Sequence, residues 1–260
     1  MNLENKKVLV IGFAVTGIPL VRVLISLGAE VIVNDLRSYD ELKDSIEQLK
    51  GLDIKYILGK HPDDISELAH IDLAIVSPGV PLDIPFIKEI INEGIELIGE
   101  IELSYRLSRG TLIAITGTNG KTTTTALTGE IFKNAKRSTY VVGNIGVAAI
   151  SKALETKDDD YIVMEISSFQ LESCVHFHPK IAAVLNITPD HLNRHGNMEN
   201  YSNIKFSIFK NQDTNDYSIV NYDDEICNRK SKGLMGNLIY FSRLKELDRG
   251  VFLRDNFIVI

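Results

Sequence analysis

The stretch IAITGTNGKTTTT, residues 113–125, decides the fold class of this chain. An apolar run that reads as a strand (residues 112–115) leads into a glycine-rich turn, and Lys121 then opens a segment with helical character. Backbone N–H groups in such a turn point into one concavity, where the helix N-terminus adds partial positive charge. A strand, a turn and a helix in this order predict a nucleoside triphosphate site in an α/β domain.

The turn supplies the residue types that a triphosphate needs. Lys121 can place its charge on the outer phosphates, and the Thr122 hydroxyl can ligate Mg²⁺. The complete phosphate-loop pattern has a glycine four residues before the Gly-Lys pair, and Ile115 stands there instead. The alternative is a glycine-rich turn with a solvated lysine. The predicted nucleotide-binding residues are Gly117, Thr118, Asn119, Gly120, Lys121, Thr122 and Thr123.

Composition limits the classes of protein that this chain can be. It has 260 residues, 44% of them hydrophobic, a net charge of −7 and two cysteines. The charge and the lack of a long basic stripe argue against a nucleic-acid partner, and two cysteines make no disulfide framework. The N-terminal apolar run is too short to span a membrane and no cleavage signal follows it, so we expect a cytoplasmic protein without a membrane partner.

Short apolar strands alternate with amphipathic helical segments along the whole chain. This rhythm predicts parallel sheets covered on both faces. We expect two α/β domains, a Rossmann-like domain over residues 1–108 and a P-loop ATPase-type domain over residues 109–260. The predicted strands are residues 8–12, 31–34, 54–58, 73–76, 112–115, 140–142, 161–165, 182–186 and 217–220, with an incipient strand at residues 256–260. Because the chain stops on this apolar run, we expect it to be a fragment of a longer protein.

The first domain carries a weak dinucleotide fingerprint. Residues 12–17 follow the first strand, but Ala14 stands where the second glycine should be and would crowd a pyrophosphate. Asp35 ends the second strand, where an acidic residue can accept from a ribose hydroxyl, and Arg37 suggests a phosphate-bearing ligand. A Ser-Pro-Gly loop at residues 77–79 lies at the same sheet edge. A nicotinamide-dependent enzyme is therefore an alternative on these residues alone.

Four further residues belong to the predicted surroundings of the triphosphate site. Glu165 ends a buried strand, which makes it a candidate Mg²⁺ ligand. His191 and His195 are four residues apart, a spacing that suits zinc on a helix, but no cysteine and no intervening glutamate support it. Lys205 has apolar neighbours at −1, +1, +3 and +4, so we expect a buried stem and an amine that readily loses its proton; a lysine snorkelling from a helix is the alternative.

Taken together, these motifs resemble the Mur ligase family of ATP-dependent amino-acid ligases. The central motifs follow in family order: TGTNGKT (116–122), GNIG (143–146), EISSFQL (165–171), NITPDHL (186–192) and the segment of Lys205. The N-terminal motifs, VTG (15–17), NDLR (34–37), SPG (77–79) and GEIEL (99–103), are most similar to the member that uses D-glutamate. Asn193 departs from the family, which often has aspartate there.

The resemblance implies roles for individual residues. Val15, Thr16, Asp35 and Arg37 would contact uridine diphosphate, with Gly79 close by. Asn144 and Ser167 would face the substrate. Thr122 and Glu165 would hold one Mg²⁺ and His191 a second. Lys205 would be carbamylated and support the metal ions, so the expected catalytic residues are Lys121, Asn144, His191 and Lys205.

The resemblance also implies the reaction. The carboxylate of UDP-N-acetylmuramoyl-L-alanine would attack the ATP γ-phosphate, and D-glutamate would attack the resulting acylphosphate, giving an amide of a peptidoglycan precursor. A third, C-terminal domain is expected to be absent, so we expect the 260 residues alone to be an inactive, monomeric fragment. The alternatives are a Mur-type ligase for another amino acid, a folate-type ligase, which the UDP-type first domain disfavours, and a nucleotide-binding fragment without catalysis.

Overall fold

The computed structural model describes residues 1–13, 16–68, 70–144 and 146–260. The described residues divide into two compact units. Unit 1 comprises residues 1–107, 148–154 and 172–175, and unit 2 comprises residues 108–147, 155–171 and 176–260. The predicted domain boundary near residue 108 stays a prediction. Two short segments that come later in the chain, residues 148–154 and 172–175, also belong to unit 1, which the sequence does not indicate. Within the described residues, no helix is long and apolar enough to cross a membrane.

Unit 1 is built on a five-stranded sheet in which every strand pair is parallel, in the order β3-β2-β1-β4-β5. The strands are β1 (Lys7–Ile11), β2 (Glu30–Asp35), β3 (Ile54–Leu58), β4 (Leu73–Val76) and β5 (Glu96–Gly99). The helices are α1 (Gly17–Ser26), α2 (Tyr39–Glu47), η1 (Ile65–Leu68), α3 (Pro85–Asn92), α4 (Glu100–Leu107) and α6 (Ile150–Ala153). The strand order reverses between β1 and β4, which is where open sheets of this type bind ligands.

Buried apolar side chains cover both faces of this sheet. Val8 and Val10 belong to one core cluster and Leu9 and Ile11 to another, because successive strand residues point to opposite faces. This explains why β1 reads as a continuous apolar run rather than an alternating one.

A buried acid joins α4 to α6 within unit 1. Glu100 Oε1 accepts a hydrogen bond from the backbone N–H of Ile150 at 2.7 Å, and the Ser104 hydroxyl lies 3.2 Å from the same oxygen. Burial raises the pKa of this carboxyl, and the two hydrogen bonds oppose that rise. Glu100 therefore fixes the start of α6 from a distance of 50 residues along the chain.

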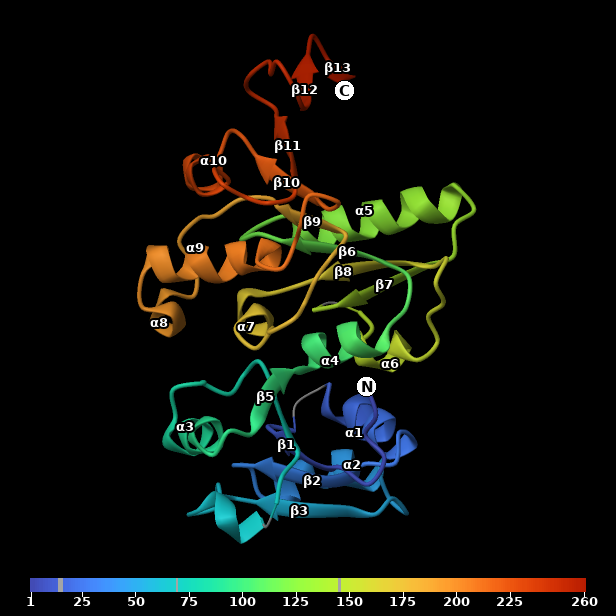
Figure 1. Cartoon of the computed structure of the whole chain (residues 1–260), viewed down its shortest axis with the longest axis vertical. Coiled ribbons are helices and arrows are strands. Elements are labelled where there is room, and N and C mark those ends of the chain that lie inside the picture. Colours follow the sequence, from blue (N-terminus) through green and yellow to red (C-terminus); the bar gives the residue numbers. More distant parts are fainter. Residues whose placement is uncertain (14–15, 69, 145) are drawn as a thin grey trace. The chain divides into compact units, whose positions relative to one another are not determined.

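Unit 2 carries an eight-stranded sheet in the order β13-β12-β11-β10-β9-β6-β8-β7 (Figure 1). Its strands are β6 (Thr111–Thr116), β7 (Thr139–Gly143), β8 (Tyr161–Glu165), β9 (Ile181–Val184), β10 (Tyr217–Asn221), β11 (Asn237–Ser242), β12 (Val251–Arg254) and β13 (Phe257–Val259). Its helices are α5 (Lys121–Asn134), α7 (Ser168–Leu171), α8 (Leu192–His195), α9 (Met198–Phe206), η2 (Ser207–Phe209) and α10 (Glu225–Lys230). The central strand β6 feeds directly into the loop before α5, as predicted.

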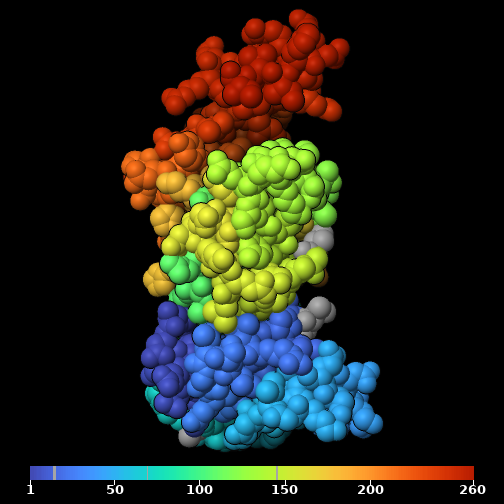
Figure 2. Space-filling view, turned by 90° about the vertical axis from the view of Figure 1, so that its right-hand side faces the viewer, coloured from blue at the N-terminus to red at the C-terminus, as the bar shows by residue number. Residues whose placement is uncertain are grey.

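The α/β architecture is confirmed, with one exception to parallel pairing. β12 and β13 form an antiparallel hairpin at the end of the sheet, coloured red in Figures 1 and 2. The predicted terminal strand is thus present, and its Phe257 and Ile258 side chains are each 74% exposed. The sequence pattern did not indicate β5, β11 or β12, which are short or only half-buried.

Candidate nucleotide and substrate sites

The loop between β6 and α5 is held by the chain segment that follows β9. Thr118 N–H donates to the Asn186 carbonyl at 2.9 Å, and Asn119 N–H donates to the Asn186 side-chain oxygen at 2.8 Å. Gly117 and Gly120 have φ angles of +154° and +83°, which favour glycine. A Cβ on Gly117 would approach Leu185 Cβ to 3.0 Å. The loop is therefore a fixed turn, and the first N–H groups of α5 lack helical partners that could compete with a ligand.

Two lysine side chains converge on this loop. Lys121 Nζ donates to the carbonyls of Gly117 (3.0 Å) and Thr118 (2.8 Å). Lys205, on α9, is only 2% exposed, and its Nζ donates to the same Gly117 carbonyl at 2.9 Å. Burial, and after it the charge of Lys121, lowers the pKa of Lys205 to about 7. The expected burial of Lys205 is thus observed, and its amine as well as its stem lies inside the protein.

Glu165 and Asn144 meet where β8 and β7 end. The Asn144 side-chain amide donates to Glu165 Oε1 at 3.1 Å, and the Asn144 backbone N–H donates to the Glu165 carbonyl at 2.9 Å. Glu165 Oε2 is buried and has no hydrogen-bond partner among the described residues. Gly143 makes this approach possible, because a Cβ there would lie 2.2 Å from the Glu165 carbonyl oxygen. A buried carboxylate oxygen without a partner is costly unless something else binds it.

The remaining predicted residues of unit 2 divide into exposed and buried side chains. Ser167 caps α7: its hydroxyl accepts from the Gln170 backbone N–H at 3.3 Å and donates to the Gln170 side-chain oxygen at 3.1 Å. His191 is exposed, lies 3.4 Å from the Asp190 carboxylate and packs on Phe169. His195 is buried and contacts the Ser168 hydroxyl at 3.0 Å. The described residues bring no metal-binding group together at His191 and His195, and the zinc alternative gains no support.

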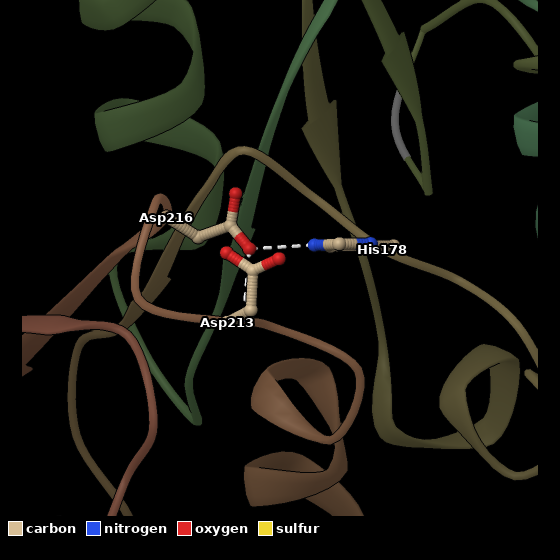
Figure 3. Close-up of side chains that lie close together, drawn as sticks. All are labelled: His178, Asp213 and Asp216. Carbon is tan, nitrogen blue, oxygen red and sulfur yellow. Dashed lines mark hydrogen bonds and ion pairs between the residues drawn. The ribbon is translucent and has the colours of Figure 1, made fainter.

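One group of possible metal ligands in the described chain lies away from these residues, at His178, Asp213 and Asp216 (Figure 3). Its Asp216 carboxylate already binds His178 Nε2 (2.5 Å) and the Asp213 backbone N–H (2.8 Å), and Lys180 Nζ lies 3.4 Å away. Burial raises the pKa of Asp216, but these hydrogen bonds hold it below its usual value. These contacts fix the turn that precedes β10, and we assign the group a structural role.

In unit 1, a cavity of about 580 Å³ lies at the carboxyl edge of the sheet, lined by Asp35, Arg37 and Gly79 among mainly apolar neighbours. Asp35 Oδ2 accepts from the Phe13 N–H (2.6 Å) and from Arg37 Nη2 (2.8 Å). Its Oδ1 accepts from the Arg37 N–H (2.8 Å) and Nε (3.0 Å). Burial raises the pKa of Asp35, but these bonds outweigh it and the pKa is lowered. The carboxylate therefore orients Arg37, and its predicted contact with a ribose hydroxyl stays a prediction.

The structure places Thr16 at the N-cap of α1, without a side-chain capping bond. Val15, also predicted to bind substrate, lies outside the described residues. Sequence reasoning missed His61 and Asn34, which meet at 2.6 Å beside the same cavity. Two features of the sequence could have indicated them: Asn34 is a polar residue near the end of the apolar strand β2, and His61 precedes a proline shortly after Gly59.

Two family models match the chain. One, the Mur ligase middle domain, matches residues 115–252, and the other, the N-terminal domain of MurD-like Mur ligases, matches residues 6–99. The UDP-N-acetylmuramoylalanine–D-glutamate ligase of Alkaliphilus oremlandii (strain OhILAs) is 63% identical over 260 residues, and that of Alkaliphilus metalliredigens (strain QYMF) is 58% identical. Each match covers 100% of this chain and 57% of the relative. The chain thus spans little more than half the length of these curated relatives.

A solved structure shares the fold. The UDP-N-acetylmuramate:L-alanyl-gamma-D-glutamyl-meso-diaminopimelate ligase from Neisseria meningitides superposes with a TM-score of 0.62 at 17% identity, covering 98% of this chain and 86% of that one. The middle-domain match alone takes in more than half of the 260 residues. The chain therefore belongs to the Mur ligase family.

Proposed function

We propose that this chain is part of an ATP-dependent ligase that adds D-glutamate to UDP-N-acetylmuramoyl-L-alanine, through an acylphosphate, in peptidoglycan precursor synthesis. The names of the relatives support the choice of substrates. The observation that carries the reaction type is the buried Lys205 amine on the Gly117 carbonyl of the phosphate loop. Nucleotide binding by the loop requires only Lys121, so a second, buried lysine at the same carbonyl indicates an additional chemical role.

In unit 2, ATP would lie on the loop of residues 117–123 and the N-terminus of α5. Lys121 would leave its two loop carbonyls and bind the outer phosphates, which offer it a stronger, charge-assisted partner. When the substrate carboxylate attacks the γ-phosphate, Lys121 and the N–H groups of the helix would stabilise the charge on the transferring oxygens. Asn144 and Ser167 would face the substrate.

The residues fit Mg²⁺, because the buried Glu165 Oε2 lacks a hydrogen-bond partner among the described residues and hard cations prefer oxygen ligands. Glu165 and Thr122 would hold one ion and His191 would hold a second. When bound, these ions neutralise charge on the phosphates. Asn144 would orient Glu165 by donating to its other oxygen.

Lys205 would carry a carbamate. Its neutral amine would attack carbon dioxide, so that the C–N bond forms as one C=O π bond breaks, and an N–H proton would pass to water. A lysine with its pKa near 7 is largely neutral at pH 8, so the reaction needs no further base. The carbamate replaces a buried amine with an anion that can support the cations at the phosphates.

In unit 1, the cavity beside Arg37 and Gly79 would take the uridine diphosphate part of the substrate. Asp35 would hold Arg37 in place by the ion pair described above, and Thr16 would add a contact from α1. Val15 is proposed from the family resemblance alone. We further propose that the two domains divide near residue 108, and that the protein acts as a cytoplasmic monomer without membrane or nucleic-acid partners.

The direct test is ADP release by the protein at the full length of its curated relatives. We expect release that requires both UDP-N-acetylmuramoyl-L-alanine and D-glutamate, and little release with L-glutamate or with longer peptide precursors. Preference for another amino acid or for a longer precursor would assign the protein to a different branch of the family. In parallel, the 260-residue chain should bind UDP and a non-hydrolysable ATP analogue in calorimetry.

A further inference from the structure

The cavity of unit 1 contains a histidine whose hydrogen-bonding role is fixed by its neighbour. His61 lines the cavity and stacks on Phe86, with ring centroids 4.9 Å apart and planes 18° apart. Its Nδ1 lies 2.6 Å from the side-chain oxygen of Asn34. A half-turn of the ring would keep the stacking on Phe86 but would lose the contact of Nδ1 with Asn34.

Asn34 determines which ring nitrogen of His61 carries the proton. The Asn34 side chain is fully buried, and its amide nitrogen donates to the carbonyls of Ile57 (2.9 Å) and Lys60 (2.8 Å). Two carbonyl acceptors fix the orientation of the amide, so its oxygen must face His61. An oxygen can only accept, and Nδ1 of His61 must therefore be the protonated nitrogen.

The other ring nitrogen is then an acceptor. Burial lowers the pKa of His61 below its ordinary value, and the nearby Asp35 charge opposes that shift only in part. At neutral pH the ring is uncharged, and Nε2 carries a lone pair. No described residue donates a hydrogen bond to Nε2.

The other polar side chains of the cavity cannot play this role selectively. The Asp35 oxygens already accept four hydrogen bonds, two each, from Arg37 and the Phe13 N–H. The Ser77 hydroxyl lines the cavity too, but a hydroxyl can donate or accept and so does not discriminate between ligands. Among the described side chains that line the cavity, His61 Nε2 is the acceptor whose role is fixed.

We propose that His61 is a specificity-determining residue of this cavity, whose Nε2 accepts a hydrogen bond from the N–H of a uracil base and so selects uridine over cytidine nucleotides. Uracil carries a hydrogen on N3, whereas cytosine carries a lone pair there, which would face the lone pair of Nε2. The apolar neighbours Val80, Pro81 and Ile84 suit the flat faces of a base. The inference rests on the proposed binding of uridine diphosphate by unit 1.

The test is calorimetric binding of UDP and CDP to the 260-residue chain and to His61→Phe, which keeps an aromatic ring against Phe86 but has no acceptor. We expect the wild-type chain to prefer UDP by about tenfold or more, because a site built around one hydrogen bond rejects a ligand that cannot make it. In His61→Phe the preference should fall to within about twofold, mainly through weaker UDP binding. His70→Phe is the matched control, since His70 is 81% exposed and does not line the cavity.

The possible failures are distinct. If the wild-type chain binds neither nucleotide, both the proposed UDP binding by unit 1 and the role of His61 are wrong. If it binds UDP but has no preference over CDP, or if folded His61→Phe keeps the wild-type preference, His61 is not the discriminating group and the UDP site itself stands.

A measurement on the wild-type chain needs no variant. Burial holds the pKa of His61 below its ordinary value, so Nε2 becomes protonated, and a donor, only in acid; the UDP to CDP affinity ratio should then fall as the pH is lowered from 8. UDP and CDP carry the same diphosphate, so the effect of phosphate protonation on binding cancels in the ratio of the two affinities. Two charged groups near His61 come from β2 and the residues after it: Asp35, whose pKa is lowered, and Arg37, whose pKa is raised. Next to His61 in the sequence, Lys60 forms an ion pair with Asp63 at 3.0 Å. The loop after β4 and the start of α3 line the cavity without a charged residue. A ratio that stays constant while the His61 ring protonates, as followed by NMR of the same chain, would overturn the assignment.

Discussion

Lys121 and Lys205 donate hydrogen bonds to one carbonyl oxygen, that of Gly117, at 3.0 and 2.9 Å. Two ammonium groups at a single acceptor repel each other, so the charge on one disfavours the charge on the other. Lys121 lies at the helix N-terminus and is partly exposed, whereas Lys205 is buried. Lys205 is therefore the amine that gives up its proton, and its reactivity depends on burial and on Lys121.

The first prediction concerns the carbamate on Lys205. With ¹³C-bicarbonate at pH 8, the 260-residue chain should show a carbamate carbon signal by NMR. The signal should fade as the pH drops below 7, because the amine becomes protonated around its pKa of about 7. Lys205→Met should lose the signal and Lys210→Met, an exposed lysine nearby, should keep it. A signal that survives in Lys205→Met would assign the carbamate elsewhere.

The second prediction concerns the coupling between the two lysines. Lys121→Met removes a positive charge that lowers the pKa of Lys205, so this pKa should rise. The pH at which half of the carbamate signal appears should move upward in the same NMR titration. Lys133→Met, on the exposed far end of α5, should leave that pH unchanged. An unchanged midpoint in Lys121→Met would show that burial alone sets the pKa.

The third prediction concerns Glu165 as a cation ligand. Glu165→Gln removes the negative charge of the buried carboxylate while nearly preserving its shape. The increase in ADP affinity that Mg²⁺ produces should fall by about tenfold, since one charge-assisted ligand is lost. Affinity without Mg²⁺ should change little. Glu130→Gln, exposed on α5, is the control, and equal Mg²⁺ dependence in both variants would contradict the role of Glu165.

The fourth prediction concerns the close contact of β7 with β8. Gly143 has φ +114°, and a Cβ there would lie 2.2 Å from the Glu165 carbonyl oxygen. Gly146 has φ +78°, but a Cβ there would meet no described atom within 4 Å. Gly146→Ala should cost about 1–2 kcal/mol from backbone strain alone. Gly143→Ala adds the clash and should lower the melting temperature at least twice as much, as followed by calorimetry.

The fifth prediction concerns the buried Glu100. Burial raises its folded-state pKa above the unfolded value of 4.5, so the folded state binds the proton more tightly. Its ionisation therefore costs stability as the pH rises through the folded-state pKa. Glu100→Gln should be more stable than the wild type at pH 8, and this advantage should vanish near pH 4. Exposed Glu93→Gln should show no such trend in denaturant unfolding.

The local parts of the fold could be predicted from the sequence. The strand β6, the glycine turn and α5 are consecutive, and their residue types determine their conformations. The apolar neighbours of Lys205 correctly indicated its burial, because helical spacing shows which side chains share a face. β5, β11 and β12 escaped prediction because their short or half-buried runs carry no clear period.

The long-range contacts could not be predicted. Asp35 has the position of a ribose acceptor, and only the structure shows that Arg37 and the Phe13 N–H occupy its oxygens. The tautomer of His61 depends on Asn34, 27 residues away, and the Glu100 contact spans 50 residues. Such partners are set by tertiary packing, which residue types and spacing do not record.

Unit 1 consists of three separate stretches of chain, and this has a genetic consequence. A crossover that exchanged residues 1–107 alone would pack the core side chains Leu24 and Leu103 of one parent against Ile150 and Ala153 of the other. Core side chains selected to fit one another in each parent would then meet partners of different size. Hybrids between diverged relatives should therefore be more stable when the segments at 148–154 and 172–175 are inherited together with the first 107 residues.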